Sequence, residues 1–392
     1  MIPELRARFN RSWTPELYAE FLRRLDEASG TQVGFRCSET PVFLPKDLLA
    51  EMIRYGPELY GQLAANPAYL KAADATIPAE FRVPGPTQHP LFVQADFGLI
   101  REPDGTLAPR LVEIQGFPSV YAFQAMLARQ YCEVFRLPEN LTPFLGGLNE
   151  TSYFDLLAKA ILGDHAPEET ILLEIDPYRQ KTAADFLLTR QRLGIQIACV
   201  RDVQRQGSKL FFERKPVKRI YNRVIVDELV RKNVKGGFAF RDDVDVEWAG
   251  HPNWFFLLSK FSLPWFQHKC VPETRFLSDV NPLPDNLRDY VLKPLYSFAG
   301  LGVNISPTKQ DIEAIPPDKR GDFILQRKME FVPTIETPSG ITKIEIRIMY
   351  VWDAGGLKPV TTVVRSGRGK MMGVDFNKNL DWVGATAGFH IE

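Results

Sequence analysis

Apolar residues recur at helical spacing near the start of the chain. In the stretch that begins at Thr14 they occupy positions 17, 18, 21, 22 and 25, which share one face of a helix. Thr14 is a typical capping residue, and Pro15 suits the first helical position because the N–H it lacks would have no helical partner there. We therefore expect residues 1–80 to form a helical cover over the rest of the protein.

Strand and helix patterns alternate in the next two regions. Residues 81–150 contain two strand-like runs and then a helix directly after Ser119. Residues 151–255 follow the order strand, helix, strand, with Gly194 at the end of the helix, which predicts a βαβ unit with a patch of parallel sheet. Residues 256–392 are rich in strands and glycine turns. The pattern predicts an α/β (α+β) fold class.

Composition narrows the possible partners. The chain has 392 residues, 45% of them hydrophobic, so it can bury one large core or several smaller ones. Lys and Arg together number 48, as do Asp and Glu, and this balance favours neither nucleic acid nor an anionic membrane as a partner. Any phosphate binding must therefore be local.

The cysteines and the apolar runs bear on location. The four cysteines lie far apart without C-x-x-C spacing, which argues against a zinc ribbon or a disulfide-rich secreted fold. No run of about 18 apolar residues is present, and the N-terminus lacks the apolar core of a signal peptide. We therefore expect a cytoplasmic protein. We also expect no transition-metal site, because the five histidines show no ligand spacing.

The stretch E-I-Q-G-F-P-S, from Glu113 to Ser119, suggests a site for a metal ion. It ends a strand that follows another strand, at 91–100, after a P-D-G turn. This hairpin would bring Asp96 of the first strand beside Glu113 of the second. Alternatively, both carboxylates belong to the solvated face of an ordinary hairpin.

A possible phosphate loop lies in the last region. The stretch from Tyr290 to Ile305 reads as a strand that carries Lys293, a loop with Gly300 and Gly302, and a second strand. Glycines let backbone amides approach phosphate oxygens because they have no Cβ. The loop is neither a Walker loop nor a dinucleotide fingerprint. Taken alone, two glycines in such a loop fit a structural turn better than a phosphate loop.

Two further segments carry polar residues on apolar strands. The strand from Asp322 ends in a polar step around Gln326 and Lys328. In the strand from Ile344, Glu345 and Arg347 share one face, and the other face holds Ile346, Ile348 and Tyr350. Arg347, or Arg365 in the next strand, would be costly to bury unless an anion lies beside it. Phosphate is one candidate anion.

Together these segments resemble the ATP-grasp superfamily. That family normally ends with a late Asp and an E-x-N triplet, whereas the only acids here after Arg365 are Asp375, Asp381 and Glu392. If the fold is circularly permuted, the missing strands come first and carry Asp96 and Glu113. Residues from about 90 to 390 are thus similar to the circularly permuted ATP-grasp proteins typified by the synthetase domain of glutathionylspermidine synthase.

The resemblance implies roles for individual residues. Regions 81–150 and 256–392 would form the ATP-grasp core, and 151–255 a pre-ATP-grasp-like domain. The implied site residues are Asp96, Glu113 and Gln115 for Mg²⁺, Lys260 and Lys293 for the ATP phosphates, Ser297, Gly300 and Gly302 in a lid over them, Gln326 and Lys328 at the adenine hinge, and Ser119, Arg347 and Arg365 at the reaction centre. The chain departs from the family at Gln115, where an asparagine is usual, and at Gln94, where an arginine is usual.

The implied activity is that of an ATP- and Mg²⁺-dependent ligase, which joins a small-molecule carboxylate to an amine through an acyl phosphate. Arg36, Glu39 and Arg223 are candidates for substrate contacts, although an ordinary salt bridge explains each of them better. Three alternatives stay open: a phosphotransferase on the same fold, a regulatory protein that binds nucleotide without catalysis, and an ordinary α/β protein without nucleotide. The oligomeric state is open as well.

Overall fold

The computed structural model describes residues 1–297 and 300–392. Its helices are α1 (Pro3–Ser12), α2 (Pro15–Ser29), α3 (Lys46–Ala64), α4 (Pro67–Ala75), α5 (Tyr121–Phe135), α6 (Glu150–Leu162), α7 (Ala183–Leu193), α8 (Val226–Arg231), α9 (Trp254–Leu257) and α10 (Lys309–Glu313). Its strands are β1 (Val42–Phe43), β2 (Phe92–Arg101), β3 (Leu107–Gln115), β4 (Leu141–Thr142), β5 (Thr170–Glu174), β6 (Gln196–Cys199), β7 (Gln204–Gln206), β8 (Lys209–Phe212), β9 (Lys215–Val217), β10 (Arg219–Asn222), β11 (Glu247–Ala249), β12 (Thr274–Phe276), β13 (Tyr290–Pro294), β14 (Phe323–Arg327), β15 (Ile335–Thr337), β16 (Gly340–Asp353), β17 (Gly356–Gly367), β18 (Gly384–Thr386) and β19 (Gly388–Ile391). The mixed α/β fold class is confirmed.

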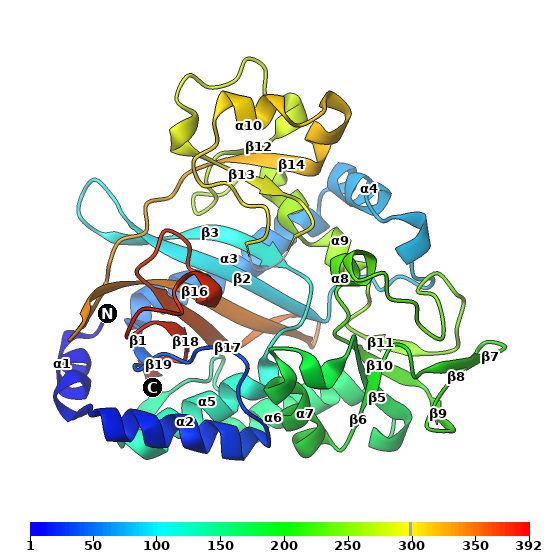
Figure 1. Ribbon diagram of the computed structural model, residues 1–392, viewed down its shortest axis with the longest axis horizontal. Helices are drawn as coiled ribbons and strands as arrows, with labels where there is room; N and C mark the ends of the chain where they lie inside the picture. The colour runs from blue at the N-terminus through cyan, green and yellow to red at the C-terminus, as the bar shows by residue number, and fades with distance from the viewer. Residues whose placement is uncertain (298–299) are drawn as a thin grey trace.

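A long antiparallel sheet forms the centre of the protein (Figure 1). Its strand order is β18-β17-β16-β2-β3, and β15 pairs with β16. Strands β2 and β3 come from the front of the chain, whereas β16 and β17 come from its end. Asp96 pairs with Arg347 on one side and with Glu113 on the other, so the two carboxylates lie side by side as expected.

The two faces of this sheet differ because side chains alternate along each strand. One face is apolar and packs with α3 in the main core, which includes Ala95, Phe97, Ile346, Ile348 and Tyr350. The opposite face carries Asp96, Glu345, Arg347 and Arg365. The predicted alternation around Arg347 is therefore confirmed, and the polar face belongs to the candidate site.

Helix α3 contains a proline, and the sheet compensates for it. Pro57 has no N–H, so the carbonyl of Ile53 cannot make its usual bond within the helix. The hydroxyl of Tyr350 donates to this carbonyl at 2.9 Å. Gly56 allows the approach, since a Cβ there would lie 2.3 Å from the tyrosine ring. This contact fixes α3 against the apolar face of the sheet.

The predicted βαβ unit is confirmed. Strands β5 and β6 are parallel and α7 connects them, with Gly194 in the left-handed conformation at the helix end. The complete sheet has the order β11-β10-β5-β6. The chain therefore leaves β5 on one side for β6 and later returns on the other side with β10. This reversal is a topological switch point between β5 and β10.

A third sheet, with the order β12-β14-β13, lies above the central sheet in Figure 1 together with α10. The strand that carries Lys293 is confirmed as β13, but the second strand expected after Gly302 is wrong. Among the described residues directly after Gly302, a single bridge forms to β13, between Leu292 and Asn304. The Asn304 side chain accepts a bond from the N–H of Ser306 at 3.0 Å, which turns the chain away from β13.

The N-terminal region contains α1 to α4, and strand β1, which was not expected there, pairs in parallel with β19. The Thr14 hydroxyl caps α2 by accepting from the N–H of Leu17 at 3.3 Å. The four cysteines are free thiols. None of the helices in the described part of the chain combines the length and the apolar character that a membrane crossing requires.

Candidate active site

Asp96 lies at the centre of the polar sheet face and is almost fully buried, at 1% exposure. Its Oδ1 accepts from Arg347 Nε at 2.5 Å, and its Oδ2 accepts from Arg347 Nη2 at 2.7 Å and from Arg365 Nη1 at 3.0 Å. Burial by itself raises the pKa of Asp96, but the two guanidinium groups outweigh it and lower the pKa. Asp96 is therefore a stable anion that holds both arginines in place.

Arg365 also donates to Glu345. Burial, with the charges of Asp96 and Glu113, raises the pKa of Glu345 against the opposing effect of Arg365. Sequence reasoning had placed Glu345 beside Arg347 on one face without assigning it to the site. The signal was present, because Glu345 precedes Arg347 by two residues on the same strand.

Two lysines approach this face from outside the central sheet. Lys260 begins a short 3₁₀ helix (Lys260–Trp265), and its Nζ lies 3.5 Å from Glu113 Oε2 and donates to the Ser297 carbonyl at 2.5 Å. Lys293, on β13, donates to Gln326 Oε1 at 2.6 Å and to the Val112 carbonyl at 3.2 Å. Because Val112 lies on β3, Lys293 joins the third sheet to the edge of the central sheet.

Lys293 is buried without a carboxylate in hydrogen-bond contact among the described residues. Burial lowers the pKa of Lys293 to about 8, with a smaller opposing effect from Glu113. An ammonium group in this environment is stabilised by any anion that enters the site.

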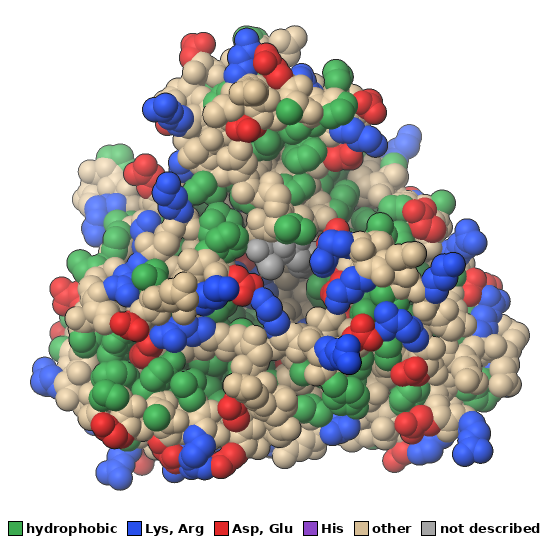
Figure 2. Space-filling view, in the orientation of Figure 1, with side chains coloured by type: hydrophobic (Ala, Val, Ile, Leu, Met, Phe, Trp, Pro, Cys, Tyr) green, Lys and Arg blue, Asp and Glu red, His purple; other side chains and the backbone are tan. Residues whose placement is uncertain are grey.

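These side chains form one set, which we call the charged cluster: Asp96, Glu113, Lys260, Lys293, Glu345, Arg347 and Arg365. Four of its members are cations and three are carboxylates, so the cluster has an excess of one positive charge. Figure 2 shows a hollow in the middle of one face of the molecule, with Lys and Arg side chains around it.

Two cavities lie beside the central sheet, and members of the charged cluster line the smaller one. The smaller, of about 20 Å³, is lined by Glu113, Gln115, Lys260 and Ser297 among others. The Ser297 hydroxyl is buried and has no hydrogen-bond partner within the described residues. A polar atom in this state is costly and indicates a missing partner.

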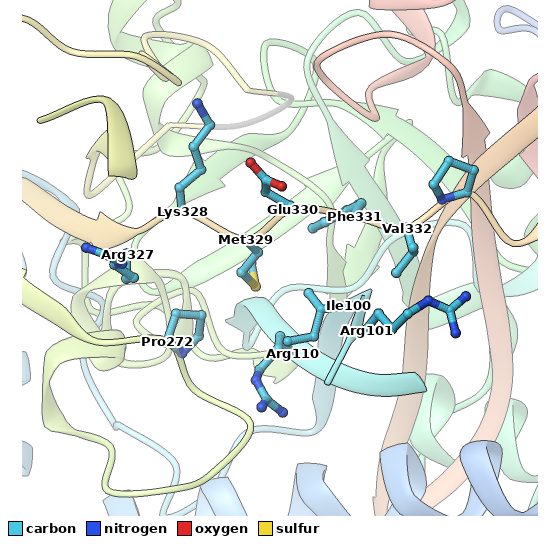
Figure 3. Close-up of a pocket in the computed structure, with 11 residues that line it drawn as sticks. Ile100, Arg101, Arg110, Pro272, Arg327, Lys328, Met329, Glu330, Phe331 and Val332 are labelled. Atoms are coloured by element: carbon cyan, nitrogen blue, oxygen red, sulfur yellow. The ribbon is translucent and has the colours of Figure 1, made fainter. Parts of the chain in front are cut away.

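The larger cavity, of about 550 Å³, lies between β2, β3 and the segment after β14 (Figure 3). Its walls are partly apolar, with Ile100, Met329 and Phe331, and its cations are Arg101, Arg110, Arg327 and Lys328. Arg110 pairs with Gly98, two residues after Asp96, so this cavity lies on the same sheet face as the charged cluster. The ring of Phe331 covers Gly98, where a Cβ would lie 2.2 Å from it.

Some of the side-chain oxygens near the smaller cavity are suited to bind a hard cation. Glu113 has ion-pair distances of 3.5 Å to Lys260 and 3.8 Å to Arg347, too long for strong hydrogen bonds, so its oxygens can still coordinate. Asp96 fits this role less well, because both its oxygens are engaged by arginines. Across the described residues, no three His, Cys, Asp or Glu side chains are grouped as a metal site. Glu113 and the amide oxygen of Gln115 fit Mg²⁺ best.

The structure places the other predicted residues as follows. The Gln326 amide donates to Thr274 Oγ1 at 3.0 Å. Lys328 lines the larger cavity, and its Nζ donates to Ser306 Oγ at 3.3 Å. The Ser119 carbonyl accepts from Gln94 at 3.1 Å. Gly300 and Gly302 have positive φ angles of 76° and 73°. Phe298 and Ala299, which the predicted lid includes, lie outside the described residues.

The three candidate substrate contacts lie outside the charged cluster. Arg36 forms an ion pair with Glu39, beside the loop that leads into β18. Arg223 lies at the end of β10, where it is buried and donates to Asp185 Oδ2 at 2.5 Å. Each makes the ordinary salt bridge that the sequence left open, and substrate binding by any of them stays a prediction.

Comparison with known proteins shows which fold the chain shares. No protein-family model and no curated protein matches the sequence. Among solved structures, a glutathione synthetase-like effector, GSS30 from Globodera pallida in its apo form, matches with a TM-score of 0.59 and 12% sequence identity, covering 96% of this chain and 99% of that chain. The chain has a glutathione synthetase-like fold. At this identity the likeness concerns the fold alone, and it extends over almost the whole of both chains.

Proposed function

We propose that the protein is an ATP- and Mg²⁺-dependent ligase that joins a carboxylate to an amine on a permuted ATP-grasp fold. The observation that carries the proposal is the charged cluster, in which Lys260 and Lys293 face carboxylates and arginines of the central sheet. The glutathione synthetase-like fold supports a ligase at the level of fold. The excess positive charge of the cluster supports an anionic ligand.

The two lysines would hold the phosphates of the nucleotide. Lys260 and Lys293 donate mainly to carbonyl oxygens in the structure, and phosphate oxygens are stronger acceptors. The buried Ser297 hydroxyl next to Lys260, which has no hydrogen-bond partner among the described residues, would gain a phosphate oxygen as its partner. The larger cavity would hold the base between Ile100 and Met329, with Lys328 at its edge.

Glu113 and Gln115 would hold Mg²⁺ through their oxygens, with Asp96 behind them. When bound, the ion would supply charge neutralisation between the phosphates. Arg347 and Arg365, held in place by Asp96, would stabilise negative charge on the transferring phosphoryl group and on the substrate carboxylate.

The proposed reaction has two steps. A carboxylate oxygen of the acid attacks the γ-phosphorus and ADP leaves, which gives an acyl phosphate. The amine then attacks the acyl carbon, loses a proton and expels phosphate, which carries away one oxygen of the original carboxylate. Neither step needs a nucleophile from the protein.

The fate of that oxygen tests the function. The protein is incubated with ATP, Mg²⁺ and mixtures of amines and ¹⁸O-labelled carboxylic acids. We expect phosphate release that requires both an acid and an amine, with ¹⁸O in the phosphate and an amide product. A phosphorylated product with no free phosphate would support the phosphotransferase, and ADP binding without any turnover would support the regulatory protein.

The depressed pKa of Lys293 predicts a pH dependence. With a pKa of about 8 in the free protein, Lys293 loses its charge as the pH rises above 8. A bound phosphate favours the charged form, so ADP binding should take up about half a proton at pH 8 and close to one proton at higher pH, and affinity should fall by up to about tenfold per pH unit above 8. Titration calorimetry in buffers of different ionisation enthalpy measures both effects. An affinity that is constant from pH 7 to 9.5 would contradict the assignment.

A further inference from the structure

Gln94 occupies a position that connects three parts of the site. It lies on β2 two residues before Asp96, and it is fully buried, at 0% exposure. Its Oε1 accepts from Arg347 Nη1 and from Gln115 Nε2, each at 2.8 Å. Its Nε2 donates to the Ser119 carbonyl at 3.1 Å. The amide thus joins an arginine of β16, the end of β3 and the turn before α5.

The chemistry of its neighbours determines how the Gln94 amide is oriented. A guanidinium group can only donate, so the oxygen of Gln94 must face Arg347. A backbone carbonyl can only accept, so the nitrogen of Gln94 must face Ser119. In the reverse orientation the Gln94 nitrogen would face the guanidinium group of Arg347, donor against donor. The Gln94 oxygen would face the Ser119 carbonyl, acceptor against acceptor.

The orientation of Gln94 in turn determines that of Gln115. The oxygen of Gln94 also faces the Gln115 side chain, and only the Gln115 nitrogen can donate to it. The Gln115 oxygen is therefore left for the small cavity that Gln115 lines with Glu113 and Lys260. In the opposite orientation, Gln115 would present its NH₂ group to this cavity and would repel a cation.

We propose that Gln94 is a positioning residue. Because Arg347 can only donate, it fixes the orientation of the Gln94 amide, and Gln94 in turn fixes Gln115 so that Gln115 presents an oxygen, and not an NH₂ group, to the metal ion. The inference rests on the proposed function, because it assigns Gln115 to the Mg²⁺ site of that function. It concerns the two positions at which this chain departs from the family that it resembles. The two glutamines act together, because the hydrogen bond from Gln115 Nε2 to Gln94 Oε1 is possible only when both amides have these orientations.

Two substitutions of Gln94 separate this role from packing. In Gln94→Glu one carboxylate oxygen still accepts from Arg347 and from Gln115, so Gln115 keeps its orientation, while the bond to the Ser119 carbonyl is lost. In Gln94→Met the shape of the side chain is nearly kept, but no acceptor faces Gln115, whose amide is then free to turn. If Gln94 only fills space, methionine should be tolerated better than a buried glutamate, which is the opposite order.

The readout is the dissociation constant of ADP with and without Mg²⁺, measured by titration calorimetry. We expect the enhancement of ADP affinity by Mg²⁺ to fall about tenfold or more in Gln94→Met and to be kept in Gln94→Glu. Affinity without Mg²⁺ should change little in Gln94→Met. Gln94→Leu replaces Gln94→Met if thermal unfolding shows that the methionine variant does not fold.

The outcomes distinguish this inference from the function on which it rests. If Mg²⁺ has no effect on ADP binding by the wild-type protein, both are overturned. If the wild type shows the effect and Gln94→Met retains it, only the role of Gln94 is overturned. Loss of the effect in Gln94→Glu together with its retention in Gln94→Met would assign Gln94 to packing.

Discussion

Replacement of Asp96 by alanine is expected to destabilise the protein by about 3–5 kcal/mol. The substitution removes the carboxylate that accepts three hydrogen bonds from Arg347 and Arg365. The Arg347 side chain is only 7% exposed, so water cannot replace the lost partner. A buried cation without its anion is the costly state of an ion pair. Urea unfolding of the two proteins at neutral pH measures the difference.

The control for Asp96→Ala is Asp353→Ala on the neighbouring strand β16. Asp353 pairs with Lys159, whose side chain is 72% exposed, and such pairs contribute less than about 1 kcal/mol. Because the folded-state pKa of Asp96 is lowered, its contribution should be complete above the ordinary Asp pKa and be lost as the pH falls below it. A loss below about 1 kcal/mol in Asp96→Ala would contradict the structural role of the pair. Asp96→Asn serves if the alanine variant does not fold.

Replacement of Lys293 by methionine is expected to lower the affinity for ADP by about 10- to 100-fold, because one charged hydrogen bond contributes about 1.5–3 kcal/mol. The stability of the free protein should not fall in parallel. Lys293 is buried at a cost, and methionine fills similar space without a charge. Calorimetric titration with ADP and urea unfolding without ligand measure the two quantities separately.

Lys309→Met is the matched control for Lys293→Met. Lys309 lies on α10, beside the same sheet, and its side chain is 74% exposed. This variant should bind ADP as the wild type does. Equal ADP affinity in Lys293→Met and Lys309→Met would remove Lys293 from the nucleotide site and would leave the charged cluster without its proposed ligand.

Much of the local structure follows from short-range patterns. The cap at Thr14, the helix stop at Gly194 and the alternation around Arg347 all depend on neighbouring residues, and each is confirmed. The strand expected after Gly302 is wrong for the same kind of reason, since the Asn304 side chain bonds to the backbone two residues later and turns the chain. A pattern of apolar residues does not reveal this competition.

Among the site residues too, contacts within one hairpin were predictable from the sequence, and contacts between distant segments were not. Asp96 and Glu113 were predicted to be neighbours because one hairpin contains both. Arg223 and Arg36 were proposed as substrate contacts, and the structure shows an ion pair within the protein for each, with Asp185 and Glu39. An arginine in a sequence shows a charge without showing its partner, and the partner of Arg223 lies 38 residues away.

The sequence by itself determined the fold class, the hairpin that aligns Asp96 with Glu113, and the types of side chain available for a phosphate and a metal ion. These depend on periodicity and on local turns. Only the tertiary structure decided which charges meet. It placed Arg347 on Asp96 across 251 residues, brought Lys293 to β3, and oriented Gln115 through Gln94. Such contacts form only when strands from the two ends of the chain pair. Burial and the direction of a hydrogen bond then depend on residues that are far apart in the sequence.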